Sequence, residues 1–269
     1  MKLLKIEEVQ FELLKLMKKV HSFLEENQLK YYLLGGSALG AVRHGGFIPW
    51  DDDIDIGMLR DDYEAFLKIL PSFDNSYDIE NFHNFNKCDF ALTRIYINNT
   101  FIDNKSISKT KLDKRLYFDI FPIDNVPDDI ASRNSFERKI LKKKKMLQYI
   151  DFRIFDSSKI KLAMKKVVSL FLHPFRGCML RSLDKLMKKY QNDRTQYVCS
   201  LCSQYSFAKQ VMHRDVYGRP VLHKFEDTEL YIPENVDSYL CTLFGADYMQ
   251  LPPEEKRRKG HDIFLTDKE

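Results

Sequence analysis

The sequence predicts a mixed α/β protein of the α+β class, in which a mixed sheet is flanked by helices and carries a basic helical insertion. Two observations predict it. Apolar side chains alternate between helical and strand spacing through the first 121 residues, and they keep helical spacing from residue 135 to about 190. Because 269 residues can bury a substantial core, we expect a single domain over residues 1–269, with the insertion at 131–196.

The beginning of the chain predicts alternating helices and strands. Residues 6–25 have apolar side chains on one helical face, with Lys and Glu elsewhere. A β-prone run at 31–34 ends at two glycines, and a short helix is expected to follow as far as Ala41. Residues 53–56 alternate polar and apolar side chains, which indicates a half-buried strand.

The following segments predict the rest of the sheet. A helix is expected at 62–70, ending before Pro71, and strands are expected at 90–97, 101–103 and 116–121. This order of elements is typical of a mixed sheet covered by helices.

The insertion predicts two basic amphipathic helices separated by a break at Gly177. Lysines flank both apolar stripes. The stripes consist of Ile160, Met164, Val167, Phe171 and Phe175, and of Leu180, Leu183, Met187 and Tyr190.

Charge is distributed unevenly along the chain. Residues 131–196 contain 18 Lys and Arg against 5 Asp and Glu, a net of +13, although the whole chain has a net charge of only +4. No RNA-module signature accompanies the lysines, so we expect no nucleic-acid partner. Two interpretations remain: residues 159–190 contact an anionic membrane, or they are packed helices whose lysines face solvent.

The N-terminus does not predict a signal peptide, because Glu7, Glu8 and Glu12 interrupt its apolar stretch. No apolar run is long enough to span a bilayer. We therefore expect a cytoplasmic protein, peripheral at the inner face of the membrane if the basic helices bind lipid. Cys199 and Cys202 are expected to be core thiols, because a zinc site would need two further ligands.

The segment from Leu34 to Ser37 predicts a phosphate-binding turn. Gly35 and Gly36 would let the backbone approach a ligand closely, because no Cβ intrudes. Ser37 is expected at a helix N-terminus, where free N–H groups and the helix dipole favour an anion.

A run of aspartates predicts a metal site. Asp53 and Asp55 are two residues apart on the expected strand, so both carboxylates would point to one face. Asp51 is two residues before Asp53, so its carboxylate would point to the same face. Two such charges repel unless a cation lies between them, and carboxylate oxygens are ligands that Mg²⁺ prefers. The alternative is a solvated acidic turn, which the apolar Ile54 and Ile56 disfavour.

Asp119 lies among apolar residues in another expected strand. A buried carboxylate is costly without a partner, and a shared metal would supply one. The alternative is a structural aspartate that accepts hydrogen bonds from backbone N–H groups.

Together, the turn at 34–37, the aspartates at 51–55 and the later Asp119 resemble the nucleotidyltransferase superfamily. The longer block from Leu34 to Ile56, Phe118-Asp-Ile-Phe-Pro-Ile-Asp124 and Phe244-Gly-Ala-Asp-Tyr-Met-Gln-Leu-Pro-Pro253 resemble the LicD family. That family contains bacterial phosphocholine transferases and fukutin-related proteins that transfer ribitol phosphate.

The resemblance implies transfer of phosphocholine from CDP-choline to a sugar hydroxyl of a lipopolysaccharide or teichoic-acid-type glycan. It implies Mg²⁺ or Mn²⁺ held by Asp53 and Asp55 with help from Asp51, and Asp119 as a metal ligand that orients or deprotonates the acceptor. Donor phosphate is expected to contact Gly35, Gly36 and Ser37 of the turn, Arg43 and His44 between the turn and the aspartates, and Glu226 of the C-terminal region. Transfer of ribitol or glycerol phosphate, nucleotidyl transfer and a non-enzymatic binding module remain as alternatives.

Overall fold

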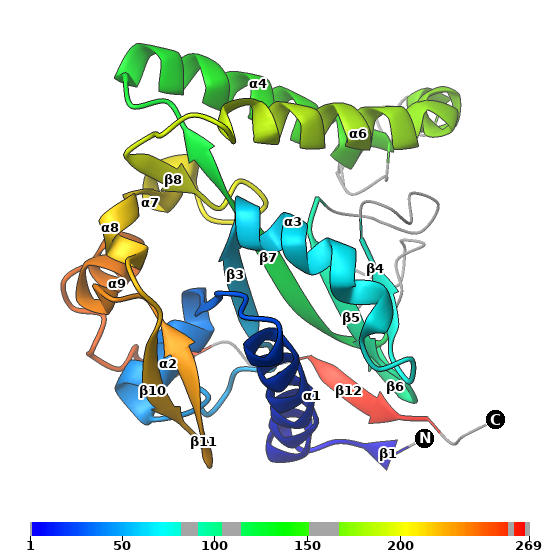
Figure 1. The fold of residues 1–269 in the computed structure, drawn as a ribbon. Coiled ribbons are helices and arrows are strands. Elements are labelled where there is room, and N and C mark those ends of the chain that lie inside the picture. The colour runs from blue at the N-terminus through cyan, green and yellow to red at the C-terminus, as the bar shows by residue number, and fades with distance from the viewer. Residues whose placement is uncertain (1, 82–90, 104–113, 151–166, 258–260, 267–269) are drawn as a thin grey trace.

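A computed structural model describes residues 2–81, 91–103, 114–150, 167–257 and 261–266 (Figure 1). Its helices are α1 Ile6–Glu26, α2 Gly35–His44, α3 Arg60–Ile69, α4 Ile130–Ile150, α6 Arg176–Met187, α7 Phe207–Gln210, α8 Arg214–Tyr217 and α9 Val236–Phe244. Its strands are β1 Lys2–Leu3, β2 Tyr32–Leu33, β3 Asp55–Leu59, β4 Asp78–Glu80, β5 Thr93–Ile97, β6 Thr100–Asp103, β7 Leu116–Val126, β8 Tyr197–Cys199, β9 Val211–His213, β10 Val221–Phe225, β11 Thr228–Ile232 and β12 Asp262–Leu265.

The main sheet is mixed, which confirms the predicted fold class. Its strands follow the order β2-β3-β7-β5-β4 within the described residues, and β8 pairs with the end of β7 and with β9. β3 and β7 run parallel, whereas β2, β5 and β8 are antiparallel to the strands they join. Two smaller sheets accompany it: a β10–β11 hairpin, and a sheet in which β12 joins β1 to β6.

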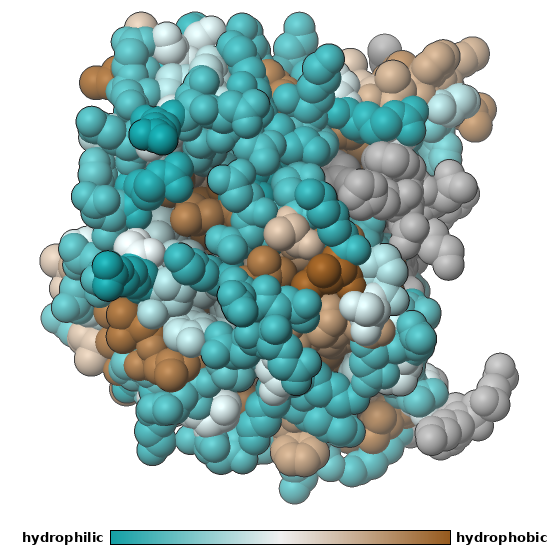
Figure 2. Space-filling model, in the orientation of Figure 1, coloured by the Kyte–Doolittle hydropathy of each residue, from teal (hydrophilic) through white to brown (hydrophobic). Residues whose placement is uncertain are grey.

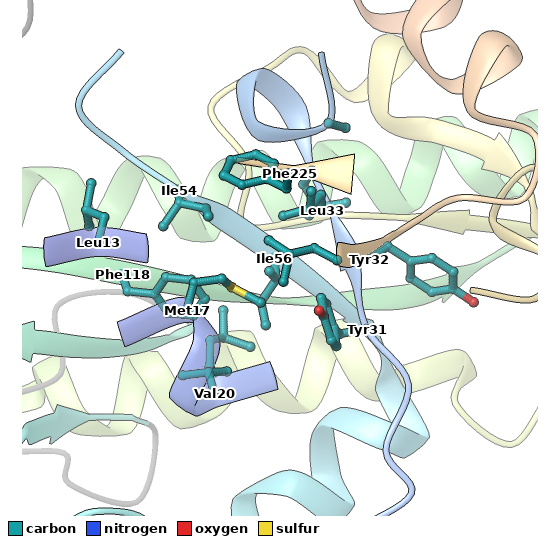
Figure 3. Packing of buried hydrophobic residues seen from close by; sticks show 14 of the residues in the cluster. Leu13, Met17, Val20, Tyr31, Tyr32, Leu33, Ile54, Ile56, Phe118 and Phe225 are labelled. Carbon is teal, nitrogen blue, oxygen red and sulfur yellow. The ribbon is translucent and has the colours of Figure 1, made fainter. Parts of the chain in front are cut away.

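One face of the main sheet is packed against helices α1 and α3. Met17 of α1 lies close to Ile56 of β3, Leu13 lies farther along the same helix, and all three side chains are fully buried (Figure 3). The hydroxyl of Tyr63 on α3 lies 2.8 Å from that of Thr93 on β5. Because neighbouring residues along a strand point to opposite faces, Asp55, beside Ile56, points away from α1.

The helical insertion lies between two strands that are neighbours in the sheet. β7 and β8 pair at residues 124–126 and 197–199, and the chain between them contains α4 and α6, which form a separate layer (Figure 1). α4 and α6 bury a second apolar cluster that includes Phe136, Ile140 and Leu183. Whether the chain is one domain with an insertion stays a prediction.

Some expected boundaries were wrong. β3 begins at Asp55, where its backbone N–H donates to the Ser37 hydroxyl, so Asp53 lies in the preceding loop rather than in the strand. The break expected at Gly177 falls instead at a 3-10 turn over His173–Phe175, because Pro174 has no N–H to continue an α-helix. The stripe residues Ile160 and Met164 lie outside the described residues.

Leu180, Leu183 and Met187 are buried as the second apolar stripe predicts. Phe171 and Phe175 of the first stripe are 72% and 60% exposed. Within the described part of the chain, no helix is long and apolar enough to cross a membrane.

Helix α1 provides a direct test of the core. We predict that Leu13→Ala, at a fully buried position, lowers the free energy of unfolding by about 3 kcal/mol through lost burial and the cavity left behind. Phe11→Ala on the same helix is the control, since Phe11 is 64% exposed and its loss should change stability by less than about 0.5 kcal/mol. Urea denaturation measures both; equal losses would contradict the described packing.

Candidate active site

The sheet brings two of the predicted aspartates together on its face opposite α1. In the parallel pair of β3 and β7, Asp55 is in register with Asp119. In the antiparallel pair of β5 and β7, Asp119 is opposite Arg94. Residues in register on adjacent strands share a face, so these side chains form a row across three strands.

Arg94 and Asp119 form a buried, two-pronged ion pair. The guanidinium Nε lies 2.7 Å from Oδ1 of Asp119, and Nη2 lies 2.8 Å from Oδ2. Arg94 also stacks over the ring of Tyr117, 3.7 Å from its centroid. Both Arg94 and Asp119 are 7% exposed. The partner that the sequence led us to expect for Asp119 was a metal; in the structure it is an arginine.

The start of α2 is tied to the start of β3. Besides the Asp55 N–H bond to the Ser37 hydroxyl, at 2.9 Å, the Leu34 N–H donates to the Asp55 carbonyl. Leu34 is the N-cap of α2, and Ser37 is the third residue of this helix, in its first turn. Its hydroxyl accepts from Asp55, so its own proton remains free to be donated to another group.

The two glycines permit close contacts around this turn. Gly35 has a φ of +50°, which favours glycine, and a Cβ at Gly36 would lie 2.8 Å from a carboxylate oxygen of Asp51. The Gly35 N–H donates to the hydroxyl of Tyr239 at 2.9 Å. That amide, which we expected to bind phosphate, is thus bonded within the protein, while Gly36 provides the close approach to Asp51.

Asp52 has a different role from its neighbours. Its carboxylate accepts from the backbone N–H of His261 at 2.6 Å and lies 2.8 Å from the imidazole Nδ1. Burial opposes the charged form, but these hydrogen bonds outweigh it and lower the pKa of Asp52. The same bond raises the pKa of His261. The C-terminal segment is thereby fastened to the acidic loop.

Repulsion and desolvation raise the pKa values of the other carboxylates. The pKa of Asp53 rises to about 6, first because protein atoms replace water around its carboxyl and then because Asp52 and Asp119 are close. Burial, then Asp53 and Asp119, raise the pKa of Asp55 well above its usual value.

These carboxylates do not form a complete metal cage. Among the described residues, no three His, Cys, Asp or Glu side chains are placed to hold an ion together. Mg²⁺ usually binds through only one or two carboxylates, with substrate phosphates and water completing the shell. Asp53 and Asp55, whose charges repel, fit that requirement; Asp51 and Asp119 as ligands stay predictions.

The structure gives other partners to three residues expected at the donor phosphate. Arg43, in the last turn of α2, donates to the carbonyls of Tyr248 and Gln250. The carboxylate of Glu226 accepts from the Phe47 N–H at 2.9 Å. His44 has an edge-on contact with Trp50. In this conformation Arg43 and Glu226 fasten loops, and donor contacts by these residues stay predictions.

Sequence reasoning missed Arg94, Tyr239 and His261. Arg94 carried the signal that identified Asp119, a charged residue in an apolar strand, but that signal does not show which strands are neighbours. Tyr239 and His261 gave no local signal, because their contacts join positions about 200 residues apart.

Comparison with known proteins identifies the family of the chain. The described site consists of a parallel strand pair that carries aspartates beside a glycine-rich turn. The family described as LicD/FKTN/FKRP, nucleotidyltransferase domain, matches residues 28–169, and the chain belongs to this family. Its members are phosphotransferases, and the chain is an enzyme of that class.

Two relatives illustrate the range of the match. The lipopolysaccharide cholinephosphotransferase LicD of Haemophilus influenzae is 27% identical over 264 residues, covering 97% of both chains. Human ribitol 5-phosphate transferase FKRP is 54% identical over 39 residues, which cover 14% of this chain and 8% of FKRP.

Two neighbouring aspartates should respond oppositely to neutralisation. Since the pKa of Asp53 is raised in the folded state, its charge opposes folding as pH rises from about 4 to 6, and Asp53→Asn should weaken that loss of stability. Asp52 has a lowered pKa, so its charge stabilises the fold above about pH 4, and Asp52→Asn should destabilise it at pH 7. Urea titrations of the metal-free variants at pH 4.5 and 7.5 measure both effects. Equal destabilisation by both variants at pH 7.5 would contradict this electrostatic account.

Proposed function

We propose that this enzyme transfers phosphocholine from CDP-choline to a sugar hydroxyl of a cell-surface glycan of the lipopolysaccharide or teichoic-acid type. The observation that carries the proposal is the similarity to the lipopolysaccharide cholinephosphotransferase of Haemophilus influenzae over 97% of both chains. A match of that extent spans the acidic loop and the row across β3, β7 and β5.

In the proposed reaction the acceptor hydroxyl oxygen attacks the phosphorus that bears choline. A new P–O bond forms, the bond from that phosphorus to the bridging pyrophosphate oxygen breaks, and CMP leaves with the bonding electrons. Asp119 orients the hydroxyl or takes its proton. A bound Mg²⁺ or Mn²⁺ would neutralise charge on the pyrophosphate.

The protein's own groups have separate tasks in this scheme. Asp53 and Asp55 would hold the cation with help from Asp51, because the repulsion between their carboxylates favours a positive ion. The Ser37 hydroxyl, whose proton is free, donates to a phosphate oxygen. The fixed positions of Ser37 and Asp55 pre-organise donor and cation relative to each other.

Transfer of ribitol or glycerol phosphate from the corresponding CDP donor is the second candidate. The short match with the ribitol 5-phosphate transferase FKRP favours it, although it covers only 39 residues. Nucleotidyl transfer is a further alternative, and its products differ. It would release pyrophosphate from CTP, whereas the proposed reaction releases CMP.

Donor selectivity tests the proposal. With Mg²⁺ and an acceptor glycan, we expect CMP release from CDP-choline, and much less from CDP-ribitol or CDP-glycerol. Asp53→Asn and Asp55→Asn should each lower turnover by about 100-fold or more, since charge stabilisation is lost at the reacting phosphorus. Asp61→Asn, at an exposed position on α3, is the control. Full turnover by a folded Asp53→Asn variant would contradict the proposed role of these aspartates. Preference for another CDP donor would show that the transferred group is not phosphocholine.

We further propose that the basic insertion holds the enzyme at the inner face of the cytoplasmic membrane, where a lipid-linked acceptor would lie. Apolar residues gather at the end of the helical layer (Figure 2). Those exposed between 167 and 175 are Val167, Val168, Leu170, Phe171 and Phe175. They lie in a segment of net charge +13, and this combination favours anionic lipid.

Vesicle sedimentation tests this contact. The protein should bind vesicles containing phosphatidylglycerol, bind pure phosphatidylcholine weakly, and dissociate as salt rises. The double substitution Phe171→Ser with Phe175→Ser should weaken binding by about tenfold or more, since two aromatic anchors are lost. Phe11→Ser, at an exposed position on α1, is the matched control. Unchanged binding by the double variant would contradict the proposed surface.

A further inference from the structure

Arg94 places a permanent positive charge beside a group of carboxylates proposed to bind a cation. It lies on β5, directly across from Asp119, and contacts both oxygens of that carboxylate. Arginine stays charged at any physiological pH, so it neutralises the charge of Asp119 throughout that range. A fixed guanidinium at such a position should repel the very ion that the site is proposed to attract.

The pairing leaves Asp119 able to do more than neutralise Arg94. A carboxylate has about four lone-pair sites, and the forked contact uses one on each oxygen. The contact fixes the plane of the carboxylate because both oxygens are held at once. The stack of Arg94 on Tyr117 fixes the guanidinium in turn. The remaining lone pairs of Asp119 therefore point in defined directions.

Stability alone is a poor explanation for this pair. Burying two charges costs several kcal/mol in desolvation, and apolar residues of similar volume often serve equally well. The row across the sheet suggests a functional reason, since Asp55 is the next residue in register beyond Asp119.

We propose that Arg94 is a positioning residue of the phosphotransfer site: it orients Asp119 and shares that carboxylate with the bound cation, so that the cation is held in the reactive geometry but not too tightly. This inference rests on the proposed function, because it assumes that a divalent cation binds beside Asp55 and Asp119.

Two variants separate the charge of Arg94 from its geometry. Arg94→Met removes both the charge and the forked contact, so the whole negative charge of Asp119 becomes available to the cation. We therefore expect Mn²⁺ to bind about tenfold more tightly, while turnover falls about 100-fold because Asp119 is no longer oriented. Arg94→Lys keeps the charge but loses the fork; Mn²⁺ affinity should stay within about threefold of the unaltered protein while turnover still falls. Mn²⁺ binding is measured by electron paramagnetic resonance at pH 8, and turnover by CMP release.

The matched control is Arg60→Met. Arg60 is also buried and pairs with a buried aspartate of β7, Asp124, at 2.6 Å. Its loss should lower the free energy of unfolding without changing Mn²⁺ affinity.

The outcomes distinguish the possible failures. If Mn²⁺ affinity and turnover in Arg94→Met match those of the unaltered protein, the role of Arg94 is overturned while the proposed function stands. If the unaltered protein binds no Mn²⁺ with or without donor, both proposals are overturned. If Arg94→Met does not fold, Arg94→Lys decides, because full turnover in that variant would overturn the positioning role.

Discussion

The parallel register of β3 and β7 is the constraint on which the site depends. It puts Asp55 next to Asp119, and the loop before β3 adds Asp51 and Asp53 to the same neighbourhood. Like charges brought this close raise one another's pKa values and oppose folding. The fold meets this cost with an arginine from β5 and the hydrogen bonds of His261 to the adjacent Asp52. The repulsion between Asp53 and Asp55 still raises the pKa values of both, and a bound cation would offset it.

The turn between β2 and α2 brings a polar surface to these carboxylates. Its two glycines let the backbone pass within reach of Asp51, and the Ser37 hydroxyl accepts from the first amide of β3. The C-terminal part of the chain completes the arrangement. Tyr239 accepts from the Gly35 amide, and the carbonyls of Tyr248 and Gln250 hold Arg43. The site is therefore a product of both ends of the chain.

Much of this arrangement could be predicted from the sequence, since periodicity and breaker residues are local signals. The amphipathic helix α1, the mixed sheet and the buried Asp119 all followed from such signals. What could not be predicted were pairings between distant segments. Nothing near Asp119 indicates that its partner is Arg94, because strand order decides which residues meet. The loop position of Asp53 was missed for a related reason: β3 extends only as far as its neighbours pair with it.

The central claim is that a divalent cation and the donor pyrophosphate meet at Asp53 and Asp55. Anomalous diffraction from crystals grown with Mn²⁺ and CDP-choline would test it most directly. The account predicts one strong manganese peak about 2.1 Å from oxygens of both aspartates, with the donor pyrophosphate coordinating the same ion. Manganese bound elsewhere, or a donor whose phosphates do not touch the ion at these carboxylates, would contradict it.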